Sequence, residues 1–278
     1  MKVKIAKEAG FCFGVKRAMK MAWDELELNS DIYALGPLIH NKQAVQRYED
    51  KGLVTVDTIN DIPNDKSVII RSHGVSSDIY DKANSNNLNI IDTTCPFVKK
   101  IHNIVKEFYE KGYKIIIIGD KKHPEIIGIN GWCENSALIV KSIDDVNSLN
   151  LDNNSKYCLV AQTTLNLELY NEIVNILSKK LDNITFKNTI CSATKTRQQA
   201  AKELSVDVDC MIVIGGKHSS NTQKLVNICK EQVPTFAIET KEDLDIDKLN
   251  KFNLIGVTAG ASTPDWIIED VISFIESL

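Results

Sequence analysis

Three cysteines, Cys12, Cys95 and Cys191, lie in the same local sequence frame. Each is followed by a lysine four residues later and by a further basic residue within the next two positions. Behind each cysteine, apolar residues recur at helical spacing, which predicts a helix directly after it. Pro96 suits the first position of such a helix and Gly112 suits its end. Because the free N–H groups and the dipole of a helix N-terminus stabilise thiolate, all three thiols are candidates for ligation or catalysis.

The spacing of these cysteines argues against a structural zinc site, which usually takes close C-x₂-C pairs and four ligands. Three isolated thiolates suit a [4Fe–4S] cluster in which one iron has no protein ligand. The alternative is three cysteines that only pack in a core. Three of the remaining four cysteines fit that plainer interpretation, since Cys158 and Cys210 lie in apolar strand-like segments and Cys229 on a helix. Cys133 lacks the frame.

Composition limits the class of protein. The chain has 278 residues, enough for about two domains, and a formal net charge of −4 that does not suggest nucleic-acid binding. Its N-terminus lacks the apolar core of a signal peptide, and its longest aliphatic run, 115–118, is far too short to span a membrane. We therefore expect a cytoplasmic protein with reduced thiols, no membrane contact and no nucleic-acid partner.

Six apolar segments rich in β-branched residues each run into a polar tip. They cover residues 32–41, 68–74, 115–125, 158–164, 211–221 and 254–262. Helix-like stretches separate them, for example 41–51, 167–180 and 222–231. This alternation predicts an α/β fold with parallel sheets covered by helices, in which the polar tips gather at the carboxyl ends of the strands.

The tips and the framed cysteines follow a repeat. Paired tips are separated by 33, 40 and 43 residues, in the pairs His40/His73, His123/Thr163 and Ser219/Ser262. A framed cysteine follows the three pairs after 22, 28 and, counting through the joined termini, 28 residues. We therefore predict three similar α/β units around a centre, with boundaries at 13–95, 96–190 and 191–278 plus 1–12.

The chemistry of the tips indicates an anionic ligand. Three tips carry a histidine, His40, His73 and His123, and the others carry hydroxyl and amide side chains. Such donors beside Gly-rich turns suit a small phosphate-bearing molecule, and neither a P-loop nor a G-x-G-x-x-G motif for a nucleotide is present. Glu125 is the one carboxylate beside a tip histidine. It is either a proton donor or a helix-start glutamate favoured by the dipole.

Taken together, these motifs closely resemble the 4-hydroxy-3-methylbut-2-enyl diphosphate reductases of the LytB/IspH family, over essentially the whole chain. The matching stretches are residues 10–15, 38–41, 71–74, 92–96, 123–125, 162–165, 190–194, 219–221 and 260–265. The order and spacing of so many stretches make the resemblance specific.

The resemblance implies three similar units with parallel sheets arranged pseudo-threefold around a central iron–sulfur cluster, a [4Fe–4S] cluster ligated by Cys12, Cys95 and Cys191. It implies that Glu125 and Thr163 are catalytic. It also implies a set of substrate-binding residues, namely His40, His73, His123, Thr163, Ser219, Ser220, Asn221 and Ser262. The reaction would be the last step of the non-mevalonate isoprenoid pathway, a two-electron reductive removal of an allylic hydroxyl that yields isopentenyl and dimethylallyl diphosphates. Flavodoxin or ferredoxin would donate the electrons, and Lys16, Lys99 and Lys195 suit an acidic donor, although solvated helix faces explain them as well.

Three other functions fit part of the pattern. A quinolinate-synthase-like dehydratase also uses three cysteines and one open iron, but needs no electron donor. An iron–sulfur sensor would need no ring of polar tip residues. A cysteine hydrolase, with Cys95 or Cys191 paired to a histidine, would leave the other two framed cysteines unexplained.

Overall fold

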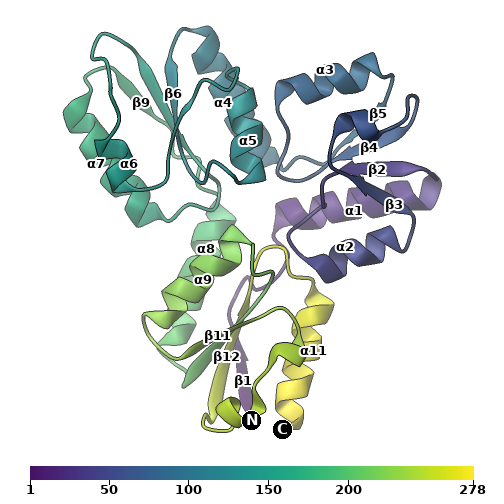
Figure 1. The fold of residues 1–278 in the computed structure, drawn as a ribbon. Coiled ribbons are helices and arrows are strands. Elements are labelled where there is room, and N and C mark those ends of the chain that lie inside the picture. Colours follow the sequence, from purple (N-terminus) through teal and green to yellow (C-terminus); the bar gives the residue numbers. More distant parts are fainter. The chain divides into compact units, whose positions relative to one another are not determined.

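The computed structural model describes residues 1–278 and contains three parallel sheets of four strands each, packed with helices (Figure 1). The predicted α/β class is therefore confirmed. The chain divides into two compact units. Unit 1 comprises Met1–Lys16, Ile39–Lys51 and Ser192–Leu278, and unit 2 comprises Arg17–Leu38 and Gly52–Cys191. The first contains one sheet and the second contains two, while the boundaries of the three predicted repeats stay a prediction.

The sheet of unit 1 has the order β1-β12-β10-β11. Its strands are β1 (Lys2–Ile5), β10 (Cys210–Ile214), β11 (Thr235–Ile238) and β12 (Leu254–Ala259). The helices of this unit are α2 (Lys42–Glu49), α8 (Ser192–Ser205), α9 (Ser220–Lys230), α10 (Ile246–Leu249), α11 (Asp265–Ser277) and the short 3₁₀ helix η2 (Lys241–Asp243). Helix α1 (Phe13–Leu28) starts in unit 1, and most of it belongs to unit 2.

Both faces of this sheet are covered. Ile212 packs with Val271 of α11 in one core, whereas its neighbour Met211 packs with Leu225 of α9 in another. Successive side chains of a strand point to opposite faces, so a strand covered on both sides must be apolar throughout. This requirement explains the uninterrupted apolar run of β10.

The sheets of unit 2 have the orders β3-β2-β4-β5 and β7-β6-β8-β9. Their strands are β2 (Ile32–Leu35), β3 (Leu53–Val56), β4 (Ser67–Ile70), β5 (Asn89–Asp92), β6 (Lys114–Ile118), β7 (Leu138–Val140), β8 (Tyr157–Ala161) and β9 (Ile184–Phe186). The helices are α3 (Ser77–Ser85), α4 (Pro96–Glu110), α5 (Pro124–Gly131), α6 (Ile143–Asn147), α7 (Leu167–Lys180) and the 3₁₀ helix η1 (Ile59–Asp61). In the second sheet Ile116 faces the core with α7, and Ile117 faces the core with α4 and α5.

Each predicted pair of tips follows two neighbouring parallel strands. The last residues of β10 and β12, Ile214 and Ala259, are register partners, and so are Ile118 and Ala161 at the ends of β6 and β8. In the remaining sheet β2 pairs with β4 in parallel. Because parallel strands end at the same edge, the loops that follow them are adjacent within each sheet.

The three helices predicted behind the framed cysteines are confirmed, since α1, α4 and α8 each begin at the residue after a cysteine. Cys95 is the N-cap of α4, Pro96 its first residue, and Gly112 follows its end with φ +78°. Helix α9 begins at Ser220, two residues earlier than the predicted start at 222. Ser219 caps it by accepting a hydrogen bond from the N–H of Thr222 (3.4 Å), so Ser220 and Asn221 form its first turn.

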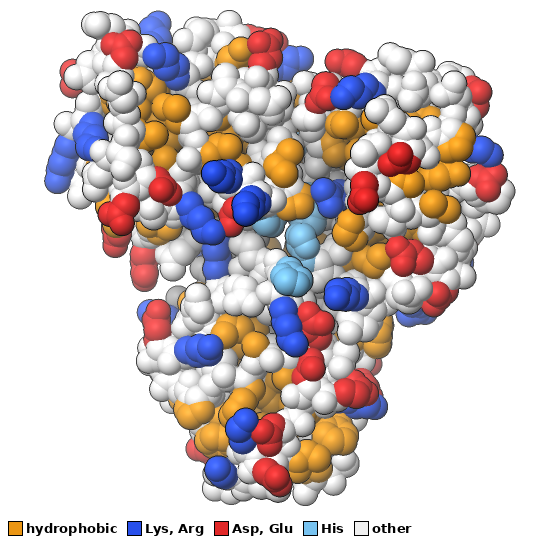
Figure 2. Space-filling model, in the orientation of Figure 1, with side chains coloured by type: hydrophobic (Ala, Val, Ile, Leu, Met, Phe, Trp, Pro, Cys, Tyr) orange, Lys and Arg blue, Asp and Glu red, His pale blue; other side chains and the backbone are white.

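None of the helices combines the length and the apolar character needed to cross a bilayer. On the face of the molecule shown in Figure 2, basic and acidic side chains are interspersed, in keeping with 33 Lys and Arg against 37 Asp and Glu in the sequence.

Candidate active site

The backbone N–H of each framed cysteine is hydrogen-bonded to one of the loops that carry the polar tip residues. In all three cases the cysteine N–H donates to a carbonyl oxygen just beyond the end of an inner strand. These bonds run from Cys12 to Ala261 (3.3 Å), from Cys95 to Ser72 (3.0 Å) and from Cys191 to Thr163 (2.9 Å). This is the pairing of cysteines with tips that the repeat spacing predicts. Local geometry therefore recurs at all three cysteines.

The framed cysteines differ from the other four in exposure. Cys12, Cys95 and Cys191 are half-buried, whereas the other cysteines are buried. Burial raises the pKa of the thiols of Cys158, Cys210 and Cys229 to about 12, and it also raises the pKa of Cys133. The prediction that Cys158, Cys210 and Cys229 pack in cores is confirmed. Each of the three half-buried thiols, at the N-terminus of a helix, is of the kind that can ligate a metal cluster as a thiolate.

Two arginines of the cysteine frames hold the backbone that precedes a framed cysteine. Arg197 is 1% exposed, and its guanidinium donates to the carbonyls of Glu8 (2.7 Å) and Gly10 (2.9 Å), just before Cys12. Arg17 similarly donates to the carbonyl of Thr94 (3.4 Å), directly before Cys95. The frame revealed these basic residues in the sequence, but not that they bind backbone carbonyls.

Glu125 and Thr163 form a buried pair in unit 2. Glu125 lies in the first turn of α5 with 3% exposure, and Thr163 follows β8 with 8% exposure. The N–H of Thr163 donates to one carboxylate oxygen of Glu125 (2.6 Å), and its hydroxyl donates to the other (2.6 Å). Both oxygens are therefore fixed by one residue, which holds the carboxyl group in a single orientation. The family resemblance implied a catalytic role for both residues, and the structure adds that they are hydrogen-bonded to each other.

Two of the predicted histidines meet beside this pair. His123 is the N-cap of α5, and its Nδ1 accepts a hydrogen bond from the N–H of Glu125 (3.2 Å). The rings of His123 and His73 are in edge-to-face contact, with centroids 5.5 Å apart. Unit 2 thus brings together two imidazoles, a carboxyl group and a hydroxyl.

The tips of unit 1 carry buried polar atoms without hydrogen-bond partners. Asn221 is 5% exposed and Ser262 is 7% exposed, yet neither end of the Asn221 amide nor the hydroxyl of Ser262 has a partner in the protein. The two residues follow the neighbouring strands β10 and β12. Buried polar groups are normally hydrogen-bonded, so unpaired ones at adjacent strand ends indicate a ligand that binds there.

His40 belongs to the same unit. Its carbonyl oxygen lies against Gly216, where any side chain would collide with it. The next residue, Asn41, caps α2 by accepting a hydrogen bond from the N–H of Ala44 (2.8 Å). The loop before α2 therefore lies beside the tip of β10, which leads through Ser219 and Ser220 into α9.

Each unit carries one part of the predicted site. In unit 1 lie Cys12, His40, Ser219, Ser220, Asn221 and Ser262, and in unit 2 lie His73, Cys95, His123, Glu125, Thr163 and Cys191. Apart from Cys12, the unit 1 part offers an imidazole, hydroxyl groups and an amide, and the carboxyl group of Glu125 belongs to the unit 2 part.

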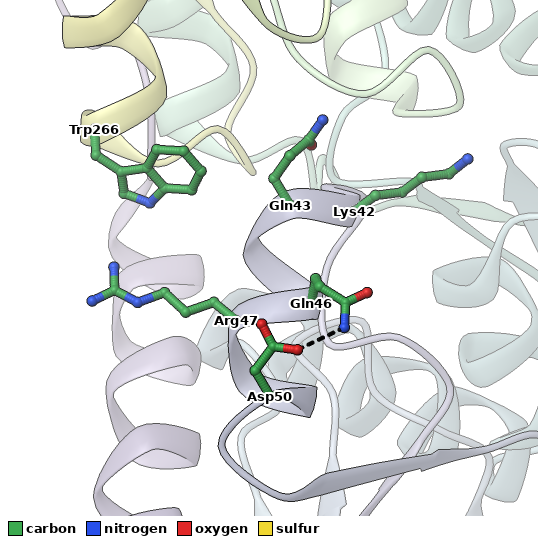
Figure 3. Close-up of a pocket in the computed structure, with 6 residues that line it drawn as sticks. All are labelled: Lys42, Gln43, Gln46, Arg47, Asp50 and Trp266. Atoms are coloured by element: carbon green, nitrogen blue, oxygen red, sulfur yellow. Dashed lines mark hydrogen bonds between the residues drawn. The ribbon is translucent and has the colours of Figure 1, made fainter.

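A separate surface pocket of about 560 Å³ lies between α2 and α11 in unit 1 (Figure 3). Trp266 of α11 faces it from one side and Arg47 of α2 from the other, with Lys42, Gln43 and Gln46 along α2. Asp50 also lines it and accepts a hydrogen bond from the Gln46 amide (2.9 Å). No motif in the sequence indicates this pocket, and none of the predicted site residues lines it.

The chain matches the model of the family described as LytB protein over residues 3–276. It is 67% identical over 279 residues to a protein of Clostridioides difficile named 4-hydroxy-3-methylbut-2-enyl diphosphate reductase, with all of both chains covered. A protein of Alkaliphilus oremlandii with the same name is 52% identical over 283 residues, again with both chains covered in full.

Two solved structures are also similar. The E-1-hydroxy-2-methyl-but-2-enyl-4-diphosphate reductase of Plasmodium falciparum superposes with a TM-score of 0.93 at 34% identity, covering 100% of this chain and 87% of that one. A second structure, described as (E)-4-hydroxy-3-methyl-but-2-enyl diphosphate reductase, the terminal enzyme of the non-mevalonate pathway, gives a TM-score of 0.74 at 39% identity with full coverage of both chains.

Proposed function

The chain belongs to the LytB family, and from this premise we propose that it is an oxidoreductase that converts 4-hydroxy-3-methylbut-2-enyl diphosphate to isopentenyl and dimethylallyl diphosphates. The reaction consumes two electrons and two protons and releases the allylic hydroxyl as water. The observation that supports the proposal best is the buried Glu125–Thr163 pair, a carboxyl group held by a hydroxyl and an N–H in a protein that is similar over its full length to proteins named as such reductases.

We assign the proton delivery to Glu125, with Thr163 as its partner. Hydroxide is a poor leaving group, so protonation on the way out lowers the barrier, and a second proton completes the product. Thr163 holds the carboxyl group through both oxygens, which fixes the direction in which a proton is delivered. A Thr hydroxyl both donates and accepts, so Thr163 can pass a proton between Glu125 and the substrate hydroxyl.

The diphosphate is assigned to the polar tip residues. Asn221 and Ser262 offer buried polar atoms that lack protein partners, as expected for groups that bind a ligand. The N-terminus of α9, with Ser219 and Ser220, adds backbone N–H donors for an anion. His40, His73 and His123 complete the set as donors that gain charge when protonated. Binding the diphosphate end anchors the carbon skeleton for reaction at the other end.

We assign the ligation of a [4Fe–4S] cluster to Cys12, Cys95 and Cys191. Their half-buried thiols and their places before α1, α4 and α8 suit thiolate ligation, and the buried thiols of the remaining cysteines do not. When bound, the cluster supplies the electrons and Lewis acidity for cleavage of the C–O bond. Arg197 and Arg17 fix the backbone before Cys12 and Cys95, which holds those thiols in place.

As the physiological source of the two electrons we propose a protein donor, flavodoxin or ferredoxin. Lys16 and Lys195 are exposed one helical turn after Cys12 and Cys191, where they suit an acidic donor. Lys99, at the equivalent position after Cys95, is a weaker candidate because it forms an ion pair with Asp92 (2.6 Å).

The function is tested by mixing the anaerobically reconstituted protein with reduced viologen dye and adding 4-hydroxy-3-methylbut-2-enyl diphosphate. We expect substrate-dependent oxidation of two dye molecules per product. A protein with full iron and sulfide content that binds the substrate but oxidises no dye would instead act without redox change, as the dehydratase alternative does.

The ligand assignment is tested by comparing two cysteine variants. Cys95→Ala should lose most cluster iron, whereas Cys229→Ala, which changes a cysteine in the core of unit 1, should keep it. Iron and sulfide analysis and the visible spectrum measure the difference. Equal iron content in both variants would contradict ligation by Cys95.

A further inference from the structure

One side of α5 lies directly against the loop that carries His73. Glu125, Gly128 and Gly131 follow one another along this side at helical spacing. A Cβ atom built on Gly128 would lie 3.4 Å from the carbonyl atoms of Gly74, an ordinary contact distance. The loop 71–76 therefore packs on the same side of the helix from which Glu125 projects.

Gly131 makes the closest approach. A Cβ atom built there would collide with Cβ of Ser76 and lie 2.8 Å from its Cα, and neither atom is the end of a flexible side chain. The loop could not keep its place if Gly131 carried a methyl group, whereas Gly128 has room for one. The two glycines look alike in the sequence, and only the structure separates them.

Hydrogen bonds hold the loop where this contact places it. The indole N–H of Trp132 donates to the carbonyl of Val75 (3.0 Å), and the hydroxyl of Ser77 donates to the carbonyl of Gly131 (3.1 Å). The Trp132 ring stacks on the imidazole of His102, at 5.2 Å between centroids. That imidazole lies directly beneath Gly74, so the end of α5 and the side of α4 enclose the loop.

The loop connects three groups of the proposed site. His73 lies within it and contacts the ring of His123, the N-cap of α5. Its residue Ser72 accepts the hydrogen bond from the N–H of Cys95. A shift of the loop along α5 would therefore move His73 relative to both His123 and Glu125.

We propose that Gly131 and Trp132 are positioning residues for the reaction, which seat the loop 71–76 on α5 and thereby fix His73 relative to His123 and Glu125. The inference deepens the proposed function and rests on it. Neither residue touches the reacting groups, and both act through the loop.

The test compares Gly131→Ala with Gly128→Ala. Both changes replace a helical glycine in α5 by alanine, the better helix former, so the change in intrinsic helix propensity is matched. Gly131→Ala should lower kcat/KM for the allylic diphosphate by about tenfold or more, chiefly through KM, because sub-ångström to 1 Å displacements of a binding group have effects of this size. Gly128→Ala should stay within about twofold of the unchanged protein. Iron content and circular dichroism establish that each variant is folded and carries the cluster.

A double-mutant cycle separates positioning from general damage. If Gly131→Ala acts through His73, then adding it to His73→Gln should change kcat/KM by less than about twofold. A full tenfold loss in that background would overturn the proposal, as would equal activities of Gly131→Ala and Gly128→Ala.

If Gly131→Ala does not fold, the Trp132→Phe variant tests the proposal instead. This variant keeps an aromatic ring against His102 but removes the donor to Val75, and loss of one neutral hydrogen bond should raise KM about two- to tenfold. An unchanged KM would overturn the proposal. Absence of turnover by the unchanged protein would instead reject the proposed function, so the two failures are distinguishable.

Discussion

The buried polar groups of the candidate site differ in their hydrogen bonding between the two compact units. In unit 1 the amide of Asn221 and the hydroxyl of Ser262 are buried without protein partners. In unit 2 both carboxylate oxygens of Glu125 are occupied by Thr163. Two of the residues assigned to binding, Asn221 and Ser262, therefore carry polar atoms without partners in the protein, whereas the group assigned to proton transfer is held by a partner.

This difference has a physical reason. An unpaired buried amide costs free energy in the unligated protein, and a ligand that pairs it recovers that cost on binding. A proton donor gains nothing from lacking a hydrogen-bond partner in this way. It needs one orientation, because proton transfer depends on a short and well-aligned contact, and a fixed hydrogen-bond partner supplies this orientation.

The largest effect is expected at the carboxyl group of unit 2. Glu125→Gln keeps the size of the side chain but removes the transferable proton, so turnover should fall about 10²- to 10⁴-fold while cluster content stays unchanged. The viologen assay and iron analysis measure the two quantities. Glu168→Gln, in the exposed first turn of α7, is the matched control and should remain active. Near-normal turnover of Glu125→Gln would remove the contrast between the units.

A pH effect on stability should come from the buried imidazole of His102 in unit 2. Burial lowers its pKa to about 4, with Lys99 adding to the shift and Asp92 opposing it. Between pH 6.5 and about 4 the unfolded chain binds a proton at this residue that the folded chain does not. The free energy of unfolding should therefore decrease as pH falls through this window, by about 3 kcal/mol in total.

The His102→Phe variant tests this expectation, because phenylalanine keeps a ring beside Trp132 and does not titrate. Urea unfolding of both proteins at a series of pH values measures the difference in their stability. The difference between their free energies of unfolding should change between pH 4 and about pH 7 and should be constant above about pH 7. Parallel pH profiles would show that His102 does not contribute.

In unit 1, shortening the unpaired amide should weaken substrate binding rather than catalysis. Asn221→Ala should raise KM about 10- to 100-fold, because hydrogen bonds to a charged ligand contribute about 1.5–3 kcal/mol each, while kcat changes less. Asn227→Ala, on the exposed side of the same helix, is the control. A loss confined to kcat would move Asn221 from the binding groups to the catalytic ones.

The smallest expected effect is a change in the stability of unit 1 when its unpaired amide is removed. Asn221→Leu replaces a buried amide without partners by an apolar side chain of similar size, so the unligated protein should gain about 1 kcal/mol in the free energy of unfolding. Thermal or urea unfolding measures it, with Asn227→Leu as the exposed control. A loss of stability would indicate that the amide has a structural partner after all.

The inner strands of the three sheets could be read from the sequence, and the outer strands could not. The six apolar segments correspond to β2, β4, β6, β8, β10 and β12, which occupy the two central positions of each sheet. Central strands are covered on both faces and are therefore largely apolar. Outer strands such as β1 and β9 are short, contain polar residues and are at least partly exposed, so their sequences carry no comparable signal.

The site residues likewise divide into those whose placement could be predicted from the sequence and those whose placement could not. Spacing alone related Cys12, Cys95 and Cys191 to the tips, and the hydrogen bonds of their backbones agree with it. The burial of Arg197, by contrast, had no signal beyond its place in the frame, because a lysine or arginine on a helix is usually solvated.

Four features follow from the sequence alone, namely the α/β class, the inner strands, the helices behind the framed cysteines and the family. These features depend on local periodicity and on residue types at fixed spacing. Three further facts are visible only in the folded chain. Thr163 holds both oxygens of Glu125, Asn221 and Ser262 carry polar atoms without partners, and Gly131 but not Gly128 must be a glycine. Such facts depend on atoms tens of residues apart in the chain, whose distances are set by packing and leave no periodic trace in the sequence.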